Sequence, residues 1–153
     1  MHQFGKPVSH LYEQVVRILQ TSKPIIAAVH GAAIGGGLGV ACVADFRITC
    51  PEARFAANFT RLGFHPGFGL TVLLRELVSK NQAELLFYTG RRIGGEEATR
   101  IGLANRCVPQ ESVRAEAVKL AAEIAECAPL AIVSARRLTS AKTGRRVRIT
   151  AKA

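Results

Sequence analysis

Residues 23–39, KPIIAAVHGAAIGGGLG, decide the fold of this chain. Ile25–Val29 is a short apolar run with the length of a buried strand rather than of a helix. The His30-Gly31 pair ends that strand, and residues 32–37 carry no side chain larger than that of Ile34. A backbone of such small residues can turn sharply, and its N–H groups can approach another molecule closely.

A short buried helix is predicted over residues 38–44, directly after Gly35, Gly36 and Gly37. A strand, a glycine turn and the free N–H groups of a helix N-terminus together make a place that stabilises negative charge. Spacing argues against a nucleotide loop, because no G-x-x-x-x-G-K-[ST] is present and no acidic residue follows the glycines by about twenty positions. Close helix–strand packing that needs glycines and nothing more remains the alternative.

Length and composition predict one folded domain, since the chain has 153 residues of which 48% are hydrophobic. No segment reaches the roughly 18 uninterrupted apolar residues of a membrane span. The N-terminus lacks the charged-then-apolar order of a secretory signal, so we expect a cytoplasmic protein. The four cysteines have no metal-ligand spacing, which predicts reduced, buried thiols and no metal site.

The net charge of +10 is concentrated at the C-terminus. Seven of the 21 Lys and Arg residues lie in residues 136–153, where there is no acid, and the rest of the chain carries only +3. We therefore predict a disordered basic tail over 136–153 and expect no nucleic-acid-binding face on the fold. RNA binding through the tail alone stays open as a separate hypothesis.

Hydrophobic periodicity places further elements on both sides of the glycine turn. Gly63, Pro66, Gly67 and Gly69 exclude regular structure from residues 58–69 and predict a shaped loop there. The succession of a strand, a short helix and a strand is compatible with α/β layers. The predicted helices are 8–19, 70–78, 81–88, 94–102 and 111–127, and the predicted later strands are 45–49, 54–57 and 105–109.

Three stretches in this order resemble the crotonase superfamily, the enoyl-CoA hydratase/isomerase family. KPIIAAVHGAAIGGGLGVACVADFRI at 23–48 resembles its central strand, glycine turn and helix. LGFHPGFGLTVLL at 62–74 resembles its G-x-x-P-G-x-G-x-T-x-x-L segment. YTGRRIGGEEATRIGLANRCVP at 88–109 resembles its T-G-x-x-I-x-A-x-E-A-x-x-x-G-L-V-x-x-V-x-P segment. The resemblance covers about residues 10–135.

The resemblance implies an α/β fold with a spiral core of ββα units, followed by C-terminal helices, in homotrimers or hexamers. It also implies an enzyme that binds acyl-CoA thioesters in fatty-acid or related acyl-CoA metabolism, with coenzyme A as part of the substrate and no separate cofactor. In the family a further segment precedes the helix at Val8 and supplies a second oxyanion N–H. We therefore expect residues 1–135 to be a crotonase-like domain without its N-terminal part.

By its position in the motif, Gly36 matches the glycine whose N–H holds the thioester oxygen while an enolate forms. The positions that carry the two acids of the hydratases are Gly39 and Phe59 here, and neither side chain can move a proton. An alternative is therefore a catalytically silent protein that binds acyl-CoA or partner subunits. The residues expected to line the substrate pocket are Ala33, Ile34, Gly35, Phe59, Leu62 and Gly67.

Few titratable side chains lie near this predicted site. His65 could act as a general acid/base in place of the missing carboxylates, or could be a loop residue hydrogen-bonded to backbone, which is the commoner role for a histidine without an orienting partner. Structural roles are expected for His30 and Asp45. Glu96 and Glu97 are expected to begin a helix. Arg61 is either a solvated loop charge or a contact to a CoA phosphate.

Overall fold

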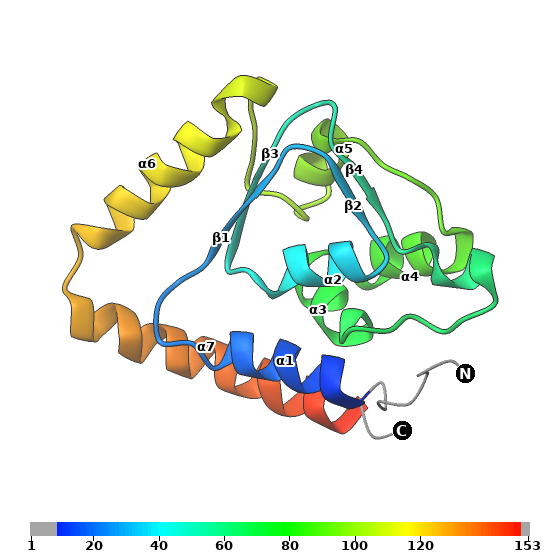
Figure 1. The fold of residues 1–153 in the computed structure, drawn as a ribbon, viewed down its shortest axis with the longest axis horizontal. Coiled ribbons are helices and arrows are strands. Elements are labelled where there is room, and N and C mark those ends of the chain that lie inside the picture. The colour runs from blue at the N-terminus through cyan, green and yellow to red at the C-terminus, as the bar shows by residue number, and fades with distance from the viewer. Residues whose placement is uncertain (1–8, 151–153) are drawn as a thin grey trace, which may run out of the picture.

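A computed structural model describes residues 9–150, which form two small parallel sheets covered by helices (Figure 1). The strands are β1 (Ile26–Val29), β2 (Ala32–Ile34), β3 (Phe46–Thr49), β4 (Arg54–Ala56) and β5 (Arg106–Cys107). The α-helices are α1 (Ser9–Leu19), α2 (Gly36–Val43), α3 (Leu70–Leu77), α4 (Lys80–Thr89), α5 (Gly95–Arg100), α6 (Val113–Ala125) and α7 (Pro129–Thr150). Two 3₁₀ turns, η1 (Asn58–Leu62) and η2 (Gln110–Ser112), complete the elements.

The chain builds two successive strand–strand–helix units, β1-β2-α2 and β3-β4-α3. The first strands of the units pair in the sheet β1-β3-β5, and the second strands pair in the sheet β2-β4. Both pairings are parallel, with Ala28 opposite Ile48 in one sheet and Ala33 opposite Phe55 in the other. This arrangement confirms the predicted α/β class with a spiral of ββα units and helices toward the C-terminus.

Glycines end or join the elements where the chain must turn or approach closely. Gly90 ends α4 in the left-handed region at φ 56°. Gly95 begins α5 against β3, where a Cβ would lie 2.0 Å from the Cys50 carbonyl oxygen. Only glycine permits that approach. The β2 strand was not predicted, because three small residues give too short a pattern to distinguish a strand from a turn.

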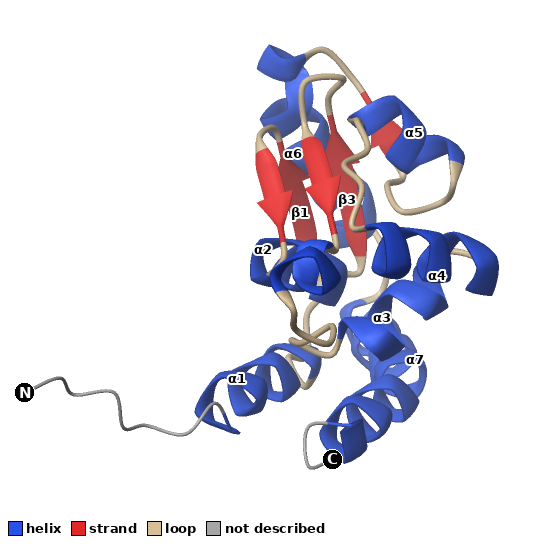
Figure 2. Cartoon of the chain, turned by 90° about the vertical axis from the view of Figure 1, so that its right-hand side faces the viewer, coloured by secondary structure: helices blue, strands red, loops and turns tan. Residues whose placement is uncertain are grey.

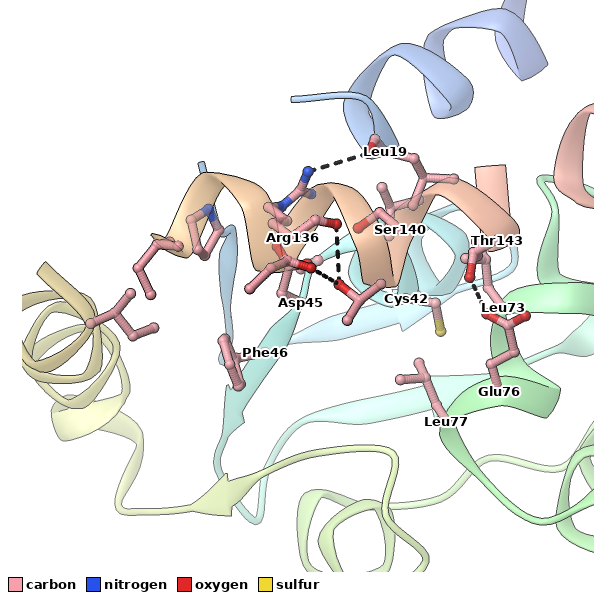
Figure 3. Close-up of a pocket in the computed structure, with 17 residues that line it drawn as sticks. Leu19, Cys42, Asp45, Phe46, Leu73, Glu76, Leu77, Arg136, Ser140 and Thr143 are labelled. Carbon is pink, nitrogen blue, oxygen red and sulfur yellow. Dashed lines mark hydrogen bonds and ion pairs between the residues drawn. The ribbon is translucent and has the colours of Figure 1, made fainter. Parts of the chain in front are cut away.

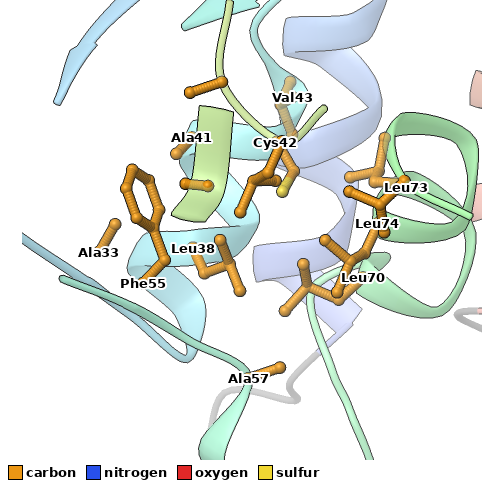
Figure 4. Close-up of a cluster of buried hydrophobic side chains, with 14 of the residues drawn as sticks. Ala33, Leu38, Ala41, Cys42, Val43, Phe55, Ala57, Leu70, Leu73 and Leu74 are labelled. Atoms are coloured by element: carbon orange, nitrogen blue, oxygen red, sulfur yellow. The ribbon is translucent and has the colours of Figure 1, made fainter. Parts of the chain in front are cut away.

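One hydrophobic core joins the two units (Figure 4). Helix α2 buries Leu38, Ala41 and Cys42 between the β2-β4 sheet and α3. Phe55 of β4 and Leu70 of α3 are fully buried against it. Helix α6 covers the β1-β3-β5 sheet (Figure 2). The short α2 is therefore the central element of the core, and its position follows from packing on both sides.

The prediction of a disordered tail is wrong for residues 136–150, which belong to α7. The physical reason is Arg136, a residue that is only 5% exposed. Its guanidinium donates to the carbonyl oxygens of Leu19 and Thr21 and to the Asp45 carboxylate. These bonds hold α7 beside α1 (Figure 1). Residues 151–153 lie outside the described part of the chain, and no helix within that part is long and apolar enough to cross a membrane.

Candidate functional site

The glycine turn connects β2 to α2 through one residue that only glycine suits. Gly35 has φ 55° and ψ −116°, a conformation that L side chains rarely adopt. Its N–H donates to the Ala56 carbonyl of β4 at 2.9 Å, and its own carbonyl accepts from the Gly39 N–H at 3.1 Å. The turn is therefore fixed from the sheet on one side and from the helix on the other.

Two exposed residues at this turn keep free backbone donors. Among the hydrogen bonds found for residues 9–150, none uses the N–H of Gly36 or Gly37. Both residues are exposed, and a Cβ built on either would meet nothing within 4 Å. They begin α2, so their N–H groups point out of the helix at its positive end. The arrangement can hold an oxygen that gains negative charge.

Aromatic rings cover the side of the turn that carries Gly35 and Gly39. A Cβ on Gly35 would lie 3.8 Å from Cζ of Phe59 and 3.3 Å from Oδ1 of Asn58. A Cβ on Gly39 would lie 2.4 Å from Cδ1 of Phe68, which is closer than atoms can approach. The Phe68 ring therefore fills the volume that a side chain at position 39 would need.

A groove of about 580 Å³ opens on the other side of α2, between that helix and β1 and β2. Its wall includes Ala33, Gly37 and Val40, and Val40 is 53% exposed. His30 is the one titratable residue among the described residues that line it. The Gln110 side-chain amide donates to the His30 carbonyl at 2.9 Å, in keeping with a structural position at the end of β1.

The structure brings together some of the residues predicted to line the substrate pocket and separates others. Ala33 is buried in β2 and Ile34 half-buried beside it, next to Gly35. Phe59 is half-buried against the turn, and the Gly67 backbone is half-buried in the following loop. By contrast, the Leu62 side chain is 62% exposed at the end of η1. The turn and Phe59 form one surface, and Leu62 extends from the molecule.

His65 is exposed, and its Nδ1 lies 3.3 Å from the carbonyl oxygen of the neighbouring Pro66. Because a carbonyl only accepts, the ring donates through Nδ1 in this contact. No carboxylate orients the ring among the hydrogen bonds and ion pairs of the described residues. The geometry therefore gives His65 a backbone partner and no orienting partner for acid/base work.

Three other predicted residues have structural contacts. The Arg61 Nε donates to the Thr89 carbonyl at 2.7 Å, and the side chain packs over Gly90. Glu97 in the first turn of α5 pairs with Arg91 at 2.7 Å. The third, Asp45, accepts from the Ile25 N–H at 2.7 Å and from Arg136 at 2.9 Å. Asp45 thus joins the start of β1 to α7.

A buried arginine completes the C-terminal end of α2. The Arg47 side chain donates to the carbonyls of Ala44 at 2.5 Å, Ala41 at 3.2 Å and Leu103 at 2.6 Å. Burial lowers the pKa of this guanidinium. The Ala41 carbonyl is in the last turn of α2 and the Ala44 carbonyl directly follows the helix, where a positive charge is favourable. Arg47 therefore satisfies carbonyls that the helix itself leaves unpaired.

A second pocket, of about 420 Å³, lies beneath α7 (Figure 3). Its wall combines apolar side chains such as Leu73 with Asp45, Arg136 and Ser140. Cys42 also lines it, and burial raises the pKa of that thiol to about 12. A thiol with such a pKa stays protonated and is not a nucleophile near neutral pH.

Asn58 and Phe68 were not predicted as parts of the site. Phe68 has φ 58° and is the only non-glycine residue with positive φ in the described part of the chain. Its place between Gly67 and Gly69 indicates a tight loop in the sequence, but a phenylalanine does not by itself predict a left-handed backbone conformation. Asn58 begins the same loop, and no pattern in the sequence relates it to Gly35.

Comparisons with known proteins agree on one family. The model of the enoyl-CoA hydratase/isomerase family matches residues 2–152. The chain is 42% identical over 123 residues to a crotonyl-CoA hydratase of Syntrophomonas wolfei, covering 80% of this chain and 47% of that protein. It is 40% identical over 129 residues to a short-chain-enoyl-CoA hydratase of Clostridium acetobutylicum, covering 84% and 49%.

A solved structure extends the agreement to the fold. The crystal structure of an enoyl-CoA hydratase from Bacillus anthracis superposes with a TM-score of 0.84 at 33% identity, covering 95% of this chain and 58% of that one. The chain spans about half the length of the curated relatives it matches. Both the sequence match and the shared architecture lead to the same conclusion: the chain belongs to the enoyl-CoA hydratase/isomerase family.

Proposed function

We propose that this chain is the acyl-CoA-binding part of a family enzyme, in which the Gly36 N–H donates to the thioester oxygen. The observation that carries the proposal is the free, exposed Gly36 N–H at the N-terminus of α2. An enolate oxygen placed there would gain a hydrogen bond and the positive end of the helix dipole. The names of the relatives, crotonyl-CoA hydratase and short-chain-enoyl-CoA hydratase, support an acyl-CoA thioester as the ligand.

The ligand would occupy the open side of the turn. The groove beside Gly37 and Val40 has an apolar wall and a volume within the range of small-molecule sites. An acyl thioester with its carbonyl oxygen on the Gly36 N–H would place its apolar chain along such a wall. Coenzyme A then enters as part of the substrate.

Two variants at one position test this assignment. Gly36→Pro removes the donor at the first position of α2, where proline is well tolerated in helices. Gly36→Ala keeps the N–H, and its Cβ has open space. We expect Gly36→Pro to lower turnover by a factor of about 10²–10³ while Gly36→Ala stays near the wild type. Circular dichroism checks that both variants are folded.

Titration with crotonyl-CoA or acetyl-CoA tests binding directly. Calorimetry should give saturable binding to the wild-type chain. No binding would remove the acyl-CoA proposal, and a folded Gly36→Pro protein with full activity would remove the role assigned to Gly36.

A second candidate is a catalytically silent acyl-CoA-binding or subunit-partner protein. The observation that favours it is the Phe68 ring, which leaves no room for an acidic side chain at position 39. Phe59, at the other acid position, presents a ring to the turn. A protein that binds acyl-CoA but turns over none of a panel of acyl-CoAs would establish this candidate over the enzyme.

We also propose, as the resemblance implies, a homotrimer or a pair of trimers with a role in fatty-acid or related acyl-CoA metabolism. A cytoplasmic location is part of the same proposal. Sedimentation equilibrium gives the assembly mass directly, and a monomer at micromolar concentration would contradict the oligomer.

A further inference from the structure

The direction of the Gly36 N–H is set by the peptide group that joins Gly35 to Gly36. In a trans peptide the carbonyl and the N–H point in opposite directions. The Gly35 carbonyl points into α2, because it accepts the Gly39 N–H at 3.1 Å. The Gly36 N–H therefore points out of the helix. Whatever holds Gly39 in place also aims this donor.

Helix α2 has only eight residues, so its own hydrogen bonds fix its first turn weakly. Within that turn Leu38 and Gly39 are buried, while Gly36 and Gly37 are exposed. The contact on Gly39 comes from Phe68, whose Cβ, Cγ and Cδ1 would all lie within 2.9 Å of a Cβ at that position. The ring thus rests directly on the Gly39 backbone.

Phe68 is itself held firmly. It is 8% exposed and adopts the left-handed backbone conformation at φ 58°. The Leu70 N–H donates to the Gly67 carbonyl across it at 3.1 Å, and α3 begins immediately afterwards with Leu70 fully buried. A non-glycine residue kept in this conformation persists only where its surroundings hold it, and such residues concentrate at functional sites.

We propose that Phe68 is a positioning residue: by packing on Gly39 it holds the Gly39 N–H on the Gly35 carbonyl and so aims the Gly36 N–H at the thioester oxygen. The inference rests on the proposed function of Gly36. The effect of Phe68 passes through Gly39 and the Gly35–Gly36 peptide.

The test uses acetyl-CoA labelled with ¹³C at its carbonyl, bound at saturation to the 153-residue chain. A well-aimed donor polarises the carbonyl and moves its ¹³C resonance downfield, and a loss of stability does not change this shift in a folded, saturated complex. We expect the wild type to give the shift and Phe68→Ala to lose most of it. Phe64→Ala, in the same loop but 65% exposed, is the matched control and should keep it.

A second measurement separates this inference from the proposed function. In the ligand-free protein, the ¹H–¹⁵N resonance of Gly36 should move in Phe68→Ala and stay in place in Phe64→Ala. If the wild-type complex gives no ¹³C shift, the role of Gly36 fails and the inference fails with it. If the wild type gives the shift and Phe68→Ala keeps all of it, or the Gly36 resonance is unmoved, only the inference is overturned.

Two further variants guard against a misfolded Phe68→Ala protein. Phe68→Leu keeps apolar bulk on Gly39 and should retain most of the ¹³C shift. Gly39→Ala should disturb the turn, because its methyl group collides with Phe68, and Phe68→Ala in the same chain should relieve the collision. A double variant with stability no better than the sum of the two single losses would show that ring and glycine act independently, against the proposal.

Discussion

The two ends of helix α2 are fixed by opposite means. At its N-terminus the backbone is held by steric contacts. Gly35 adopts a conformation that L side chains rarely adopt, and the Phe68 ring packs against Gly39. At its C-terminus the backbone is held by a charged side chain, because the Arg47 guanidinium donates to the Ala41 and Ala44 carbonyls. The first end keeps free N–H donors, whereas the Ala41 and Ala44 carbonyls at the second end accept hydrogen bonds.

The difference follows from the backbone groups at each end of α2, which are N–H donors at the first and buried carbonyls at the second. A side chain that capped the N-terminus of α2 would occupy the N–H groups that a ligand needs. Packing on the glycines fixes the same backbone and leaves those N–H groups free. The C-terminal end lies inside the fold, where an unpaired carbonyl is costly, so a buried cation satisfies it. Free donors thus require a turn that is held by packing and by the backbone hydrogen bonds of Gly35, without a capping side chain.

The largest loss of stability is expected when the Arg47 guanidinium at the C-terminal end of α2 is removed. Arg47→Met leaves the carbonyls of Ala41, Ala44 and Leu103 without that donor inside the core. We expect the free energy of unfolding in urea to fall by at least about 3 kcal/mol. Arg100→Met is the control, because its side chain is 74% exposed and its substitution should change stability by less than about 0.5 kcal/mol. Equal losses in the two variants would refute the role given to Arg47.

A smaller effect is expected at the turn. Gly35→Ala forces an L residue into φ 55° and ψ −116° and brings a methyl group to 3.3 Å from Asn58 Oδ1. We expect a loss of about 1–3 kcal/mol in the free energy of unfolding. Chemical denaturation measures it, and a variant as stable as the wild type would mean that the turn is not held in this conformation.

The smallest expected effect is a gain in stability rather than a loss. Gly37→Ala lies two residues further on, inside α2, with nothing within 4 Å of the new Cβ. Alanine restricts the unfolded chain more than glycine does, so stability should rise by about 0.5 kcal/mol. The same denaturation experiment compares it with Gly35→Ala. If both variants lost stability, the open space assigned to Gly37 would be wrong.

The sequence predicted the main elements well because their patterns are local. The helix at 70–78 is observed as α3 over Leu70–Leu77, and the strand at 45–49 as β3 over Phe46–Thr49. The glycine turn was predicted for the same reason, since small residues between a strand and a helix have few other uses.

The features that the sequence did not predict depend on distant partners. Arg136 belongs to a basic run, and only the folded chain brings it to Asp45, 91 positions away. The contact of Phe68 with Gly39 likewise joins a loop to a helix that is 29 residues earlier. Neither pairing has a local pattern, so composition favoured a tail in the first case and gave no indication in the second.

The hydrogen bonds of Arg136 to Leu19 and Thr21 span 117 and 115 positions of the chain. During synthesis, which proceeds from the N-terminus, α1 emerges from the ribosome long before Arg136, whose guanidinium donates to the carbonyl at the end of α1. Both sheets and α2 are complete in the nascent chain by then, whereas α1 has no partner for these carbonyls. Helix α1 is thus made long before α7 and reaches its final contacts late, and a nascent chain that ends before Arg136 leaves α1 and Asp45 without their cation.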